Sequence, residues 1–249
     1  MPFTISHAAA AWPLEKSKLV LSAVIVGSMA PDFDYFLNLG FTGRWTHTLA
    51  GTFEFSLPAA LIVLAVFHLL LKRPAVALLP ERVQRCIAIQ PFRFWPLGRF
   101  LLIAGSVLVG VATHLIWDSF THGQAWVVDR IGWLQTNHVL WGHSWPNYKF
   151  AQHGSTVLGL VMLAIWFRGW YRSTEPVHEI EPRLSGRVRT GIISAIVAIA
   201  FVVGLVRAWM LVGPHPLKVT FVATDVVSFV TVTTLGLLVF SLALRVWEE

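Results

Sequence analysis

The chain has 249 residues, of which 55% are hydrophobic and only 13% are charged. A soluble domain carries about 25% charged residues, so this composition excludes an ordinary soluble globular protein and indicates a membrane protein. The net charge of +6 does not indicate nucleic-acid binding, because the basic residues lie in short segments between apolar runs, where topology signals and contacts with anionic lipids are expected.

Five apolar stretches meet or approach the length of about 20 residues that a membrane-spanning helix needs. They cover about residues 53–71, 100–120, 156–171, 190–212 and 221–246. A sixth stretch, residues 19–30, is shorter and ends at Pro31, so it either continues as a broken spanning helix or enters the membrane only partway. We therefore predict an all-α, polytopic bundle of about six transmembrane helices, with five helices and a re-entrant segment as the alternative.

The distribution of Lys and Arg predicts the orientation of these helices. Residues 72–99 and 168–189 contain clusters of basic residues and are expected to face the cytoplasm, whereas residues 38–51 and 121–153 are expected outside. If the first stretch spans the membrane, both termini are cytoplasmic. If it is re-entrant, the N-terminus lies outside.

The external loop at residues 121–153, between the stretches 100–120 and 156–171, is rich in tryptophan, at Trp126, Trp133, Trp141 and Trp145. Indole rings favour the boundary between membrane and water, so we expect an interfacial loop. Residues 1–172 are predicted to form the main membrane domain, residues 173–189 a charged cytoplasmic connection, and residues 190–249 two further transmembrane helices.

Ionisable residues gather in three clusters at or near the ends of apolar segments, where charges are seldom accidental. Asp32 and Asp34 follow the stretch at residues 19–30, and Arg44 with His47 precedes the stretch at residues 53–71. His114, Asp118 and His122 lie at the end of the stretch at residues 100–120. His114 and Asp118 are four residues apart and therefore share one helix face. With Asp32 and His47 nearby, the site would offer two imidazoles and two carboxylates, a set that suits zinc, manganese or iron.

Each cluster also has a simpler interpretation. Asp32 and Asp34 could cap a turn, and His114 with Asp118 could form an intrahelical hydrogen bond. His153, in a polar segment that opens the fourth span, could equally complete a ligand set or belong to the surface. All three clusters are predicted at the same membrane face, which favours a shared metal or proton-handling site.

These motifs resemble a family of bacterial membrane proteins, the DUF4184 family. The matching segments are residues 1–10 (MPFTISHAAA), 27–36 (GSMAPDFDYF), 46–48 (THT), 114–123 (HLIWDSFTHG) and 152–155 (QHGS). The family looks like a relative of predicted membrane-bound metal-dependent hydrolases, and its pattern is similar to that of the zinc-dependent phospholipase C and S1/P1 nuclease group. The resemblance implies a multi-pass protein of the bacterial cytoplasmic membrane.

Residue by residue, the resemblance implies metal ligands at five positions: His7, Asp32, His47, His114 and Asp118. His122 matches less closely, because it lies nearer to Asp118 than in the soluble enzymes. A later His-x3-Glu or His-x3-Asp pair has no counterpart. One or two divalent ions, zinc above all, are therefore expected.

The leading hypothesis is a membrane-embedded, metal-dependent hydrolase of a phosphoester or lipid-linked substrate, with its site toward the external face. Besides the ligands, His122 or Asp34 would act as general base or orient a ligand, and Arg44 would pair with a phosphate oxygen. The alternatives are an ion- or proton-coupled transporter and a protein whose metal only stabilises the fold. No symmetric second half supports a transporter.

Overall fold

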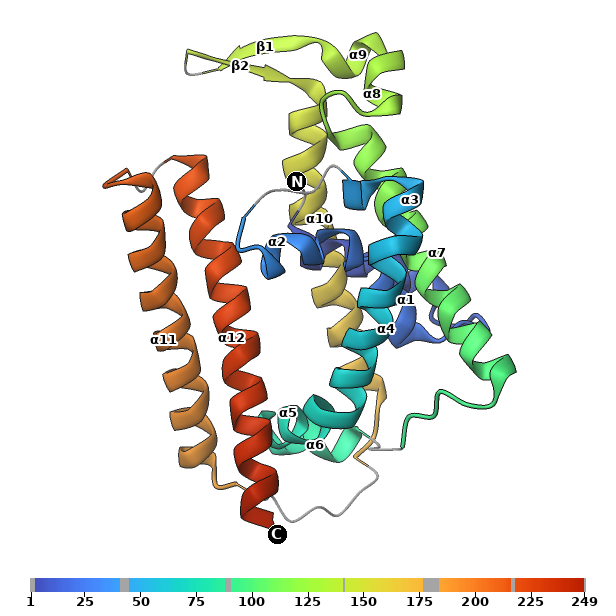
Figure 1. Cartoon of the computed structure of the whole chain (residues 1–249), viewed down its shortest axis with the longest axis vertical. Helices are drawn as coiled ribbons and strands as arrows, with labels where there is room; N and C mark the ends of the chain where they lie inside the picture. Colours follow the sequence, from blue (N-terminus) through green and yellow to red (C-terminus); the bar gives the residue numbers. More distant parts are fainter. Residues whose placement is uncertain are drawn as a thin grey trace. The chain divides into compact units, whose positions relative to one another are not determined.

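Helices dominate the structure, a computed structural model that describes residues 3–40, 45–87, 91–140, 142–176, 184–215 and 218–248 (Figure 1). Among these residues, five helical segments are long and apolar enough to cross a membrane. They are Leu49–Leu78, Leu97–Thr121, Asn147–Ser173, Gly186–Val212 and Val219–Val246. Each exceeds the length of about 20 residues that spans the hydrocarbon core. The predicted all-α, polytopic bundle is therefore confirmed.

The first of these segments is not a uniform α-helix. It consists of α3 (Leu49–Gly51), α4 (Leu57–Val66) and α5 (Lys72–Leu78), which are joined by two π-helical turns. These turns are η4 (Thr52–Ser56) and η5 (Phe67–Leu71). A short helix, α6 (Glu81–Cys86), follows.

The four other long helices are regular. They are α7 (Leu97–Thr121), α10 (Asn147–Ser173), α11 (Gly186–Val212) and α12 (Val219–Glu248). Apolar side chains such as Leu101, Val157 and Val202 remain exposed on them, and this is the surface that lipid would cover.

The first apolar stretch is not among the five candidate spans of the described residues, so of the two predicted arrangements the one with five spanning helices fits the structure. The N-terminal region instead folds into four short pieces. They are η1 (Thr4–Leu14), α1 (Leu21–Gly27), η2 (Ala30–Asp32) and α2 (Phe33–Leu37). At about 1.5 Å per residue, α1 is only about 10 Å long, which is too short to cross a bilayer.

Two glycines let α1 lie directly against α7. A Cβ at Gly27 would overlap the carbonyl oxygen of Val107, and a Cβ at Gly110 would overlap that of Val24. Around this contact the side chains of Val24, Val107 and Val111 are almost completely buried. The close approach fixes the end of α1, and with it the segment that leads to Asp32.

The tryptophan-rich loop has secondary structure of its own. It contains α8 (Trp126–Arg130), α9 (Gly132–Gln135) and an antiparallel hairpin of β1 (Asn137–Leu140) and β2 (His143–Pro146). The hairpin pairs Asn137 with Pro146 and Leu140 with His143. Val127, Val128 and Leu134 form a small core, and the partly buried Tyr148 packs against it. Trp126 and Trp133 are exposed, whereas Trp141 lies outside the described residues.

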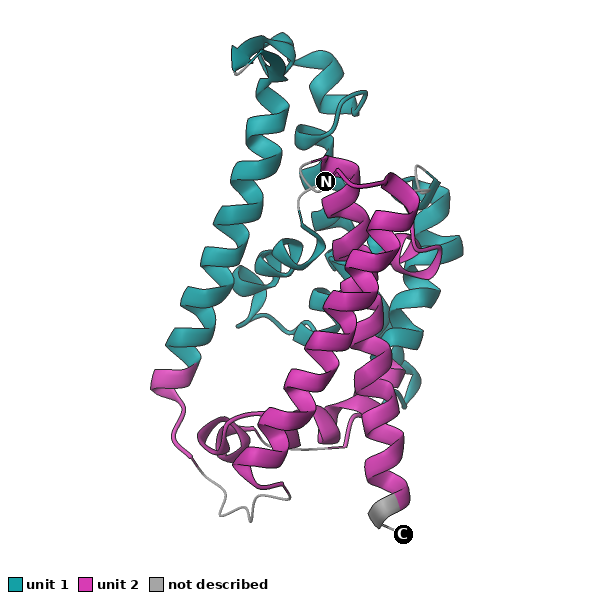
Figure 2. Cartoon of the chain, turned by 90° about the vertical axis from the view of Figure 1, so that its left-hand side faces the viewer, with its two compact units in different colours: residues 1–32, 44–64, 93–170 teal, residues 33–43, 65–92, 171–249 magenta. Residues whose placement is uncertain are grey.

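The chain divides into two compact units, which Figure 2 colours separately. Unit 1 comprises residues 1–32, 44–64 and 93–170, and unit 2 comprises residues 33–43, 65–92 and 171–249. In unit 2, α11 and α12 pack side by side, with Gly204 against the carboxyl group of Asp225 (Figure 1). The predicted division at residues 172 and 189 groups the chain differently and stays a prediction.

Candidate metal centre

Helix α7 supplies the middle of a buried polar cluster in unit 1. His114 and Asp118 lie one turn apart near its C-terminal end, and both are buried on the face that packs toward α1 and η1. Their side chains approach each other, with His114 Nε2 3.3 Å from Asp118 Oδ2. The predicted common face of these two residues is therefore confirmed.

Two further predicted ligands join them from separate elements. Asp32 ends η2 with a fully buried side chain, and His47 ends the 3-10 turn η3 (Trp45–His47), just before the first spanning segment. His47 Nε2 lies 3.4 Å from Asp32 Oδ1 and 3.5 Å from Asp118 Oδ2. His114 Nε2 lies 3.7 Å from Asp32 Oδ1 and 3.3 Å from His47 Nε2.

These distances have the size expected for ligands around one cation. In a tetrahedral zinc site with bonds of about 2.0–2.1 Å, neighbouring ligand atoms lie about 3.3–3.4 Å apart. Five of the six pairs among Asp32, His47, His114 and Asp118, those other than Asp32 with Asp118, lie 3.3 to 3.7 Å apart. The donor set, two imidazoles and two carboxylates, also suits zinc, manganese or iron.

Several buried atoms of the cluster lack a hydrogen-bond partner among the described residues. They are His7 Nε2, Asp32 Oδ1 and Asp118 Oδ1. Buried polar atoms are nearly always satisfied, so three unsatisfied atoms in one cluster call for an explanation. A cation would satisfy Asp32 Oδ1, which faces two imidazole nitrogens, whereas a simple intrahelical hydrogen bond between His114 and Asp118 leaves it unexplained.

In three of the ligand side chains, the nitrogen or oxygen that does not face the other ligands contacts a neighbouring polar group. His114 Nδ1 donates to the carbonyl oxygen of Ser28 at 2.8 Å, which leaves the lone pair of Nε2 directed into the cluster. Thr4 Oγ1 donates to Asp32 Oδ2 at 2.7 Å, and Thr46 Oγ1 lies 3.1 Å from His47 Nδ1. Such contacts fix the orientation of metal ligands in proteins.

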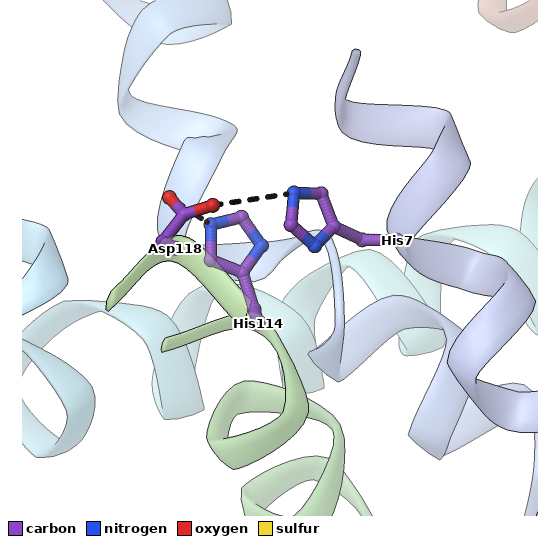
Figure 3. Close-up of side chains that lie close together, drawn as sticks. All are labelled: His7, His114 and Asp118. Atoms are coloured by element: carbon purple, nitrogen blue, oxygen red, sulfur yellow. Dashed lines mark ion pairs between the residues drawn. The ribbon is translucent and has the colours of Figure 1, made fainter. Parts of the chain in front are cut away.

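His7 also belongs to the cluster, although it stands far from the other residues in the sequence. Its ring stacks on His114 with centroids 3.9 Å apart, and its Nε2 lies 3.6 Å from Asp118 Oδ1 (Figure 3). Burial, followed by the nearby His114, lowers the pKa of His7 to about 4. The imidazole is therefore neutral at physiological pH, the state in which it can bind a metal.

His122 lies at the edge of the cluster, directly after α7. Its Nδ1 is 3.6 Å from Asp118 Oδ1, and its side chain is 30% exposed. Burial lowers the pKa of His122 as well. His122 and His47, whose side chain is 19% exposed, are the more accessible members of the cluster, so a substrate would approach on their side.

Two predicted catalytic residues are not placed in this cluster. Asp34 belongs to unit 2, where its carboxylate accepts a hydrogen bond from Asn38 Nδ2. Arg44 lies outside the described residues. His153 is exposed, and its ring packs edge-on against Trp145.

Sequence reasoning missed four residues that support the cluster: Thr4, Ser28, Lys149 and Gln152. Ser28 acts through its backbone carbonyl, which leaves no trace in the residue type. Thr4 and Gln152 lie inside segments that the family resemblance had marked, but their contacts reach Asp32 and His122 only through the tertiary fold.

The profile of a domain of unknown function, DUF4184, matches residues 1–242. This match covers nearly the whole chain, including every residue of the cluster. No curated protein and no solved structure matches the chain.

Proposed function

We propose that this chain, which belongs to the DUF4184 family, is a membrane-embedded, metal-dependent hydrolase of a phosphoester or lipid-linked substrate. The proposal depends on one observation above all. Possible ligand atoms from separate elements form two groups that share His114, one with His7 and Asp118 and one with Asp32 and His47, and within each group they lie within 4.8 Å of one another. His47 and His114 each lie 3.3 to 3.7 Å from a carboxylate oxygen of Asp32 and of Asp118.

Asp32, His47 and His114 would hold one divalent ion, and His7 and Asp118 would complete that site or, with His114, help to hold a second ion. Zinc is the best candidate, because the distances suit tetrahedral ligands, while manganese and iron share the donor preference. When bound, such an ion supplies a Lewis acid and lowers the pKa of water to about 7.

The residues of the chain would prepare the rest of the reaction. Ser28 and Thr4 fix the orientation of His114 and Asp32, so the ligands need little reorganisation. His122 stands at the accessible edge, where it could exchange a proton or orient Asp118. Arg44 remains a candidate for pairing with a phosphate oxygen, and Asp34 remains a candidate proton acceptor.

The chemistry of the surroundings supports an amphiphilic substrate. Trp45 and Leu49, on either side of His47, are exposed apolar side chains, and Trp126 is exposed four residues after His122. His47 stands just before the first spanning segment, and Asp118 lies three residues before the end of the second, so the cluster is near one end of both. A phosphate at the head-group level of a bilayer would meet the cluster there.

Basic residues support an orientation in which this end faces outward. The first two spanning segments have the cluster near one end, and their other ends, near Arg73 and Arg99, adjoin the basic segment at residues 72–99 that is expected in the cytoplasm. We propose that the protein resides in the bacterial cytoplasmic membrane with its site toward the external face, in contact with membrane lipids.

Elemental analysis of protein purified without chelator tests the metal site. We expect one or two zinc ions per wild-type chain and a loss of at least one in His114→Ala. His138→Ala is the matched control, because His138 contacts Asn147 in the hairpin region rather than the cluster. Wild-type protein without metal would contradict the proposal.

Asp118→Asn then separates hydrolysis from the other possible uses of the site. Turnover of bis(4-nitrophenyl) phosphate or of a fluorescent phospholipid in vesicles should fall by at least about 100-fold while the protein remains folded. Loss of the fold would indicate a metal that serves structure alone. Altered ion flux in vesicles without any hydrolysis would indicate a transporter.

A further inference from the structure

Helix α10 places the side-chain amide of Gln152 beside the cluster, and the proposed reaction assigns this amide no role. Gln152 is 1% exposed, and its side chain bridges two polar groups. Lys149 Nζ donates to Gln152 Oε1 at 3.0 Å, and Gln152 Nε2 lies 3.4 Å from His122 Nε2. Lys149, one turn earlier in α10, is only partly buried, so it connects a buried amide to the surface.

The chemistry of Lys149 fixes which way the Gln152 amide points. An ammonium group has donors and no acceptor, so its partner on Gln152 must be the carbonyl oxygen. The amide nitrogen is then directed toward His122. Since an amide nitrogen can only donate, His122 Nε2 must accept through its lone pair.

The contacts of the other ring nitrogen lead to the same protonation pattern. His122 Nδ1 lies 3.2 Å from the backbone carbonyl oxygen of Asp118, which can only accept. It is also 3.2 Å from Thr121 Oγ1, whose hydroxyl is directed to the carbonyl of Trp117. Three neighbours thus place the single proton of the neutral imidazole on Nδ1.

We infer that Lys149, Gln152 and His122 form a positioning relay that holds His122 with its proton on Nδ1, directed toward Asp118. The Nδ1 proton is donated to the backbone carbonyl oxygen of Asp118, and Nδ1 lies 3.6 Å from Asp118 Oδ1, beyond hydrogen-bond distance. Oδ2 is the oxygen that faces His47 and His114. The ring of His122 therefore lies against the outer oxygen of the carboxylate and limits its rotation by contact and charge, while both ring nitrogens are engaged by groups other than a cation.

This inference rests on the proposed function, because the relay affects metal binding only if a cation binds at Asp118. Of the two roles proposed for His122, proton exchange and orientation of Asp118, it selects orientation. Removing a group that orients a metal ligand typically lowers metal affinity by about 10–100-fold. Gln152→Leu and Lys149→Met should therefore weaken zinc binding by about 10-fold each, measured by competition with a chromogenic chelator. Gln135→Leu, at the end of α9 where the amide donates to the carbonyl of Val128, is the matched control and should not change the affinity.

The protonation pattern itself is tested by nitrogen NMR of protein carrying ring-15N histidine, recorded with and without added zinc. The His122 signals are identified by their absence in His122→Asn. We expect Nδ1 to be protonated and Nε2 to be unprotonated in wild type. In Gln152→Glu the side chain offers only acceptors to His122, so the proton should move to Nε2.

Isosteric variants of His122 give a readout that mere packing would not produce. An asparagine amide nitrogen lies close to the position of Nδ1, whereas a glutamine amide nitrogen lies close to that of Nε2. We expect His122→Asn to bind zinc within about threefold of wild type and His122→Gln to bind at least 10-fold more weakly.

The two proposals fail separately in these experiments. A proton on Nε2 in wild type, or equal zinc affinities in His122→Asn and His122→Gln, would overturn the relay and leave the metal site intact. Wild-type protein that binds no zinc would remove the proposed function, although the proton on Nδ1 could still be found.

Discussion

At the scale of single residues, the candidate site depends on hydrogen bonds from the N-terminal segment. Thr4 donates to the carboxylate oxygen of Asp32 that points away from the imidazoles. This bond leaves Asp32 Oδ1 as the atom that faces His47 and His114. A residue that is neither a ligand nor an acid thus selects which oxygen is presented to a cation.

Thr4→Val tests this role, because it keeps the side-chain shape and removes only the donor. We expect zinc affinity to fall by about 10-fold, measured by chelator competition. Thr190→Val, on α11, removes a hydroxyl that donates to the carbonyl of Gly186 and serves as the control. Equal affinities in wild type and Thr4→Val would show that Asp32 does not need this orientation.

The lowered pKa of His7 predicts how the metal-free protein responds to acid. In the folded state His7 takes up its proton only near pH 4, whereas an unfolded histidine does so near its ordinary value of 6.5. Between these values the unfolded state binds more protons, so the free energy of unfolding decreases as pH falls from 6.5 to 4. The contribution of His7 should be at most about 3 kcal/mol.

Thermal unfolding of the chelator-treated protein between pH 7 and 4 measures this effect. The unfolding temperature of wild type should fall with pH more steeply than that of His7→Asn. His7→Asn removes the titrating group and should itself be less stable near pH 7, because its smaller side chain loses the stacking on His114. Parallel curves for both proteins would contradict the assignment.

At the scale of elements, the contact between α1 and α7 sets the position of the ligands. Ser28 follows α1 directly, and its carbonyl accepts from His114 on α7. The backbones can approach this closely only because Gly27 and Gly110 have no side chain. The packing of two helices and the orientation of a ligand are therefore one structural feature.

Gly110→Ala should disturb both properties together. The added methyl group would overlap the carbonyl of Val24, so we expect a loss of about 1–3 kcal/mol in stability and weaker zinc binding. Gly105→Ala in the same helix meets no atom within 4 Å and should be neutral or slightly stabilising. Thermal unfolding and chelator competition measure the two effects, and an unchanged Gly110→Ala would argue against the close contact.

At the scale of the whole molecule, the order of the five candidate spans predicts that the ligands lie on one side of a membrane. With the first apolar stretch outside the set of spanning helices, His7, Asp32 and His47 all precede the first span, which begins at Leu49. His114 and Asp118 lie near the end of the second span, which returns the chain to the same side. A six-helix chain would have placed His7 on the opposite side.

Labelling of introduced cysteines with a membrane-impermeant maleimide tests this orientation. The chain has one cysteine, so the experiment starts from Cys86→Ser. Ser144→Cys, in the hairpin, should react in intact cells. Arg85→Cys, in the basic segment, should react only after the membrane is opened. The reverse pattern would place the candidate site on the cytoplasmic side.

The sequence by itself determined the class of the protein and the composition of its site. Long apolar runs have few folding alternatives, because an unsatisfied backbone in lipid is costly, so they predicted the all-helical bundle and all five spanning segments. Residue types with spacing identified His114 and Asp118 as neighbours and placed Asp32 and His47 with them, and the family resemblance added His7.

Only the tertiary structure decided how these residues meet and what supports them. A run that ends at Pro31 is compatible with a broken span or a re-entrant segment, since local preferences say nothing of what the run packs against. The close approach of α1 to α7, the bond from Thr4 to Asp32 and the Lys149–Gln152–His122 relay join residues that are distant along the chain. Contacts of this kind arise from packing in three dimensions, which no local pattern of residue types records.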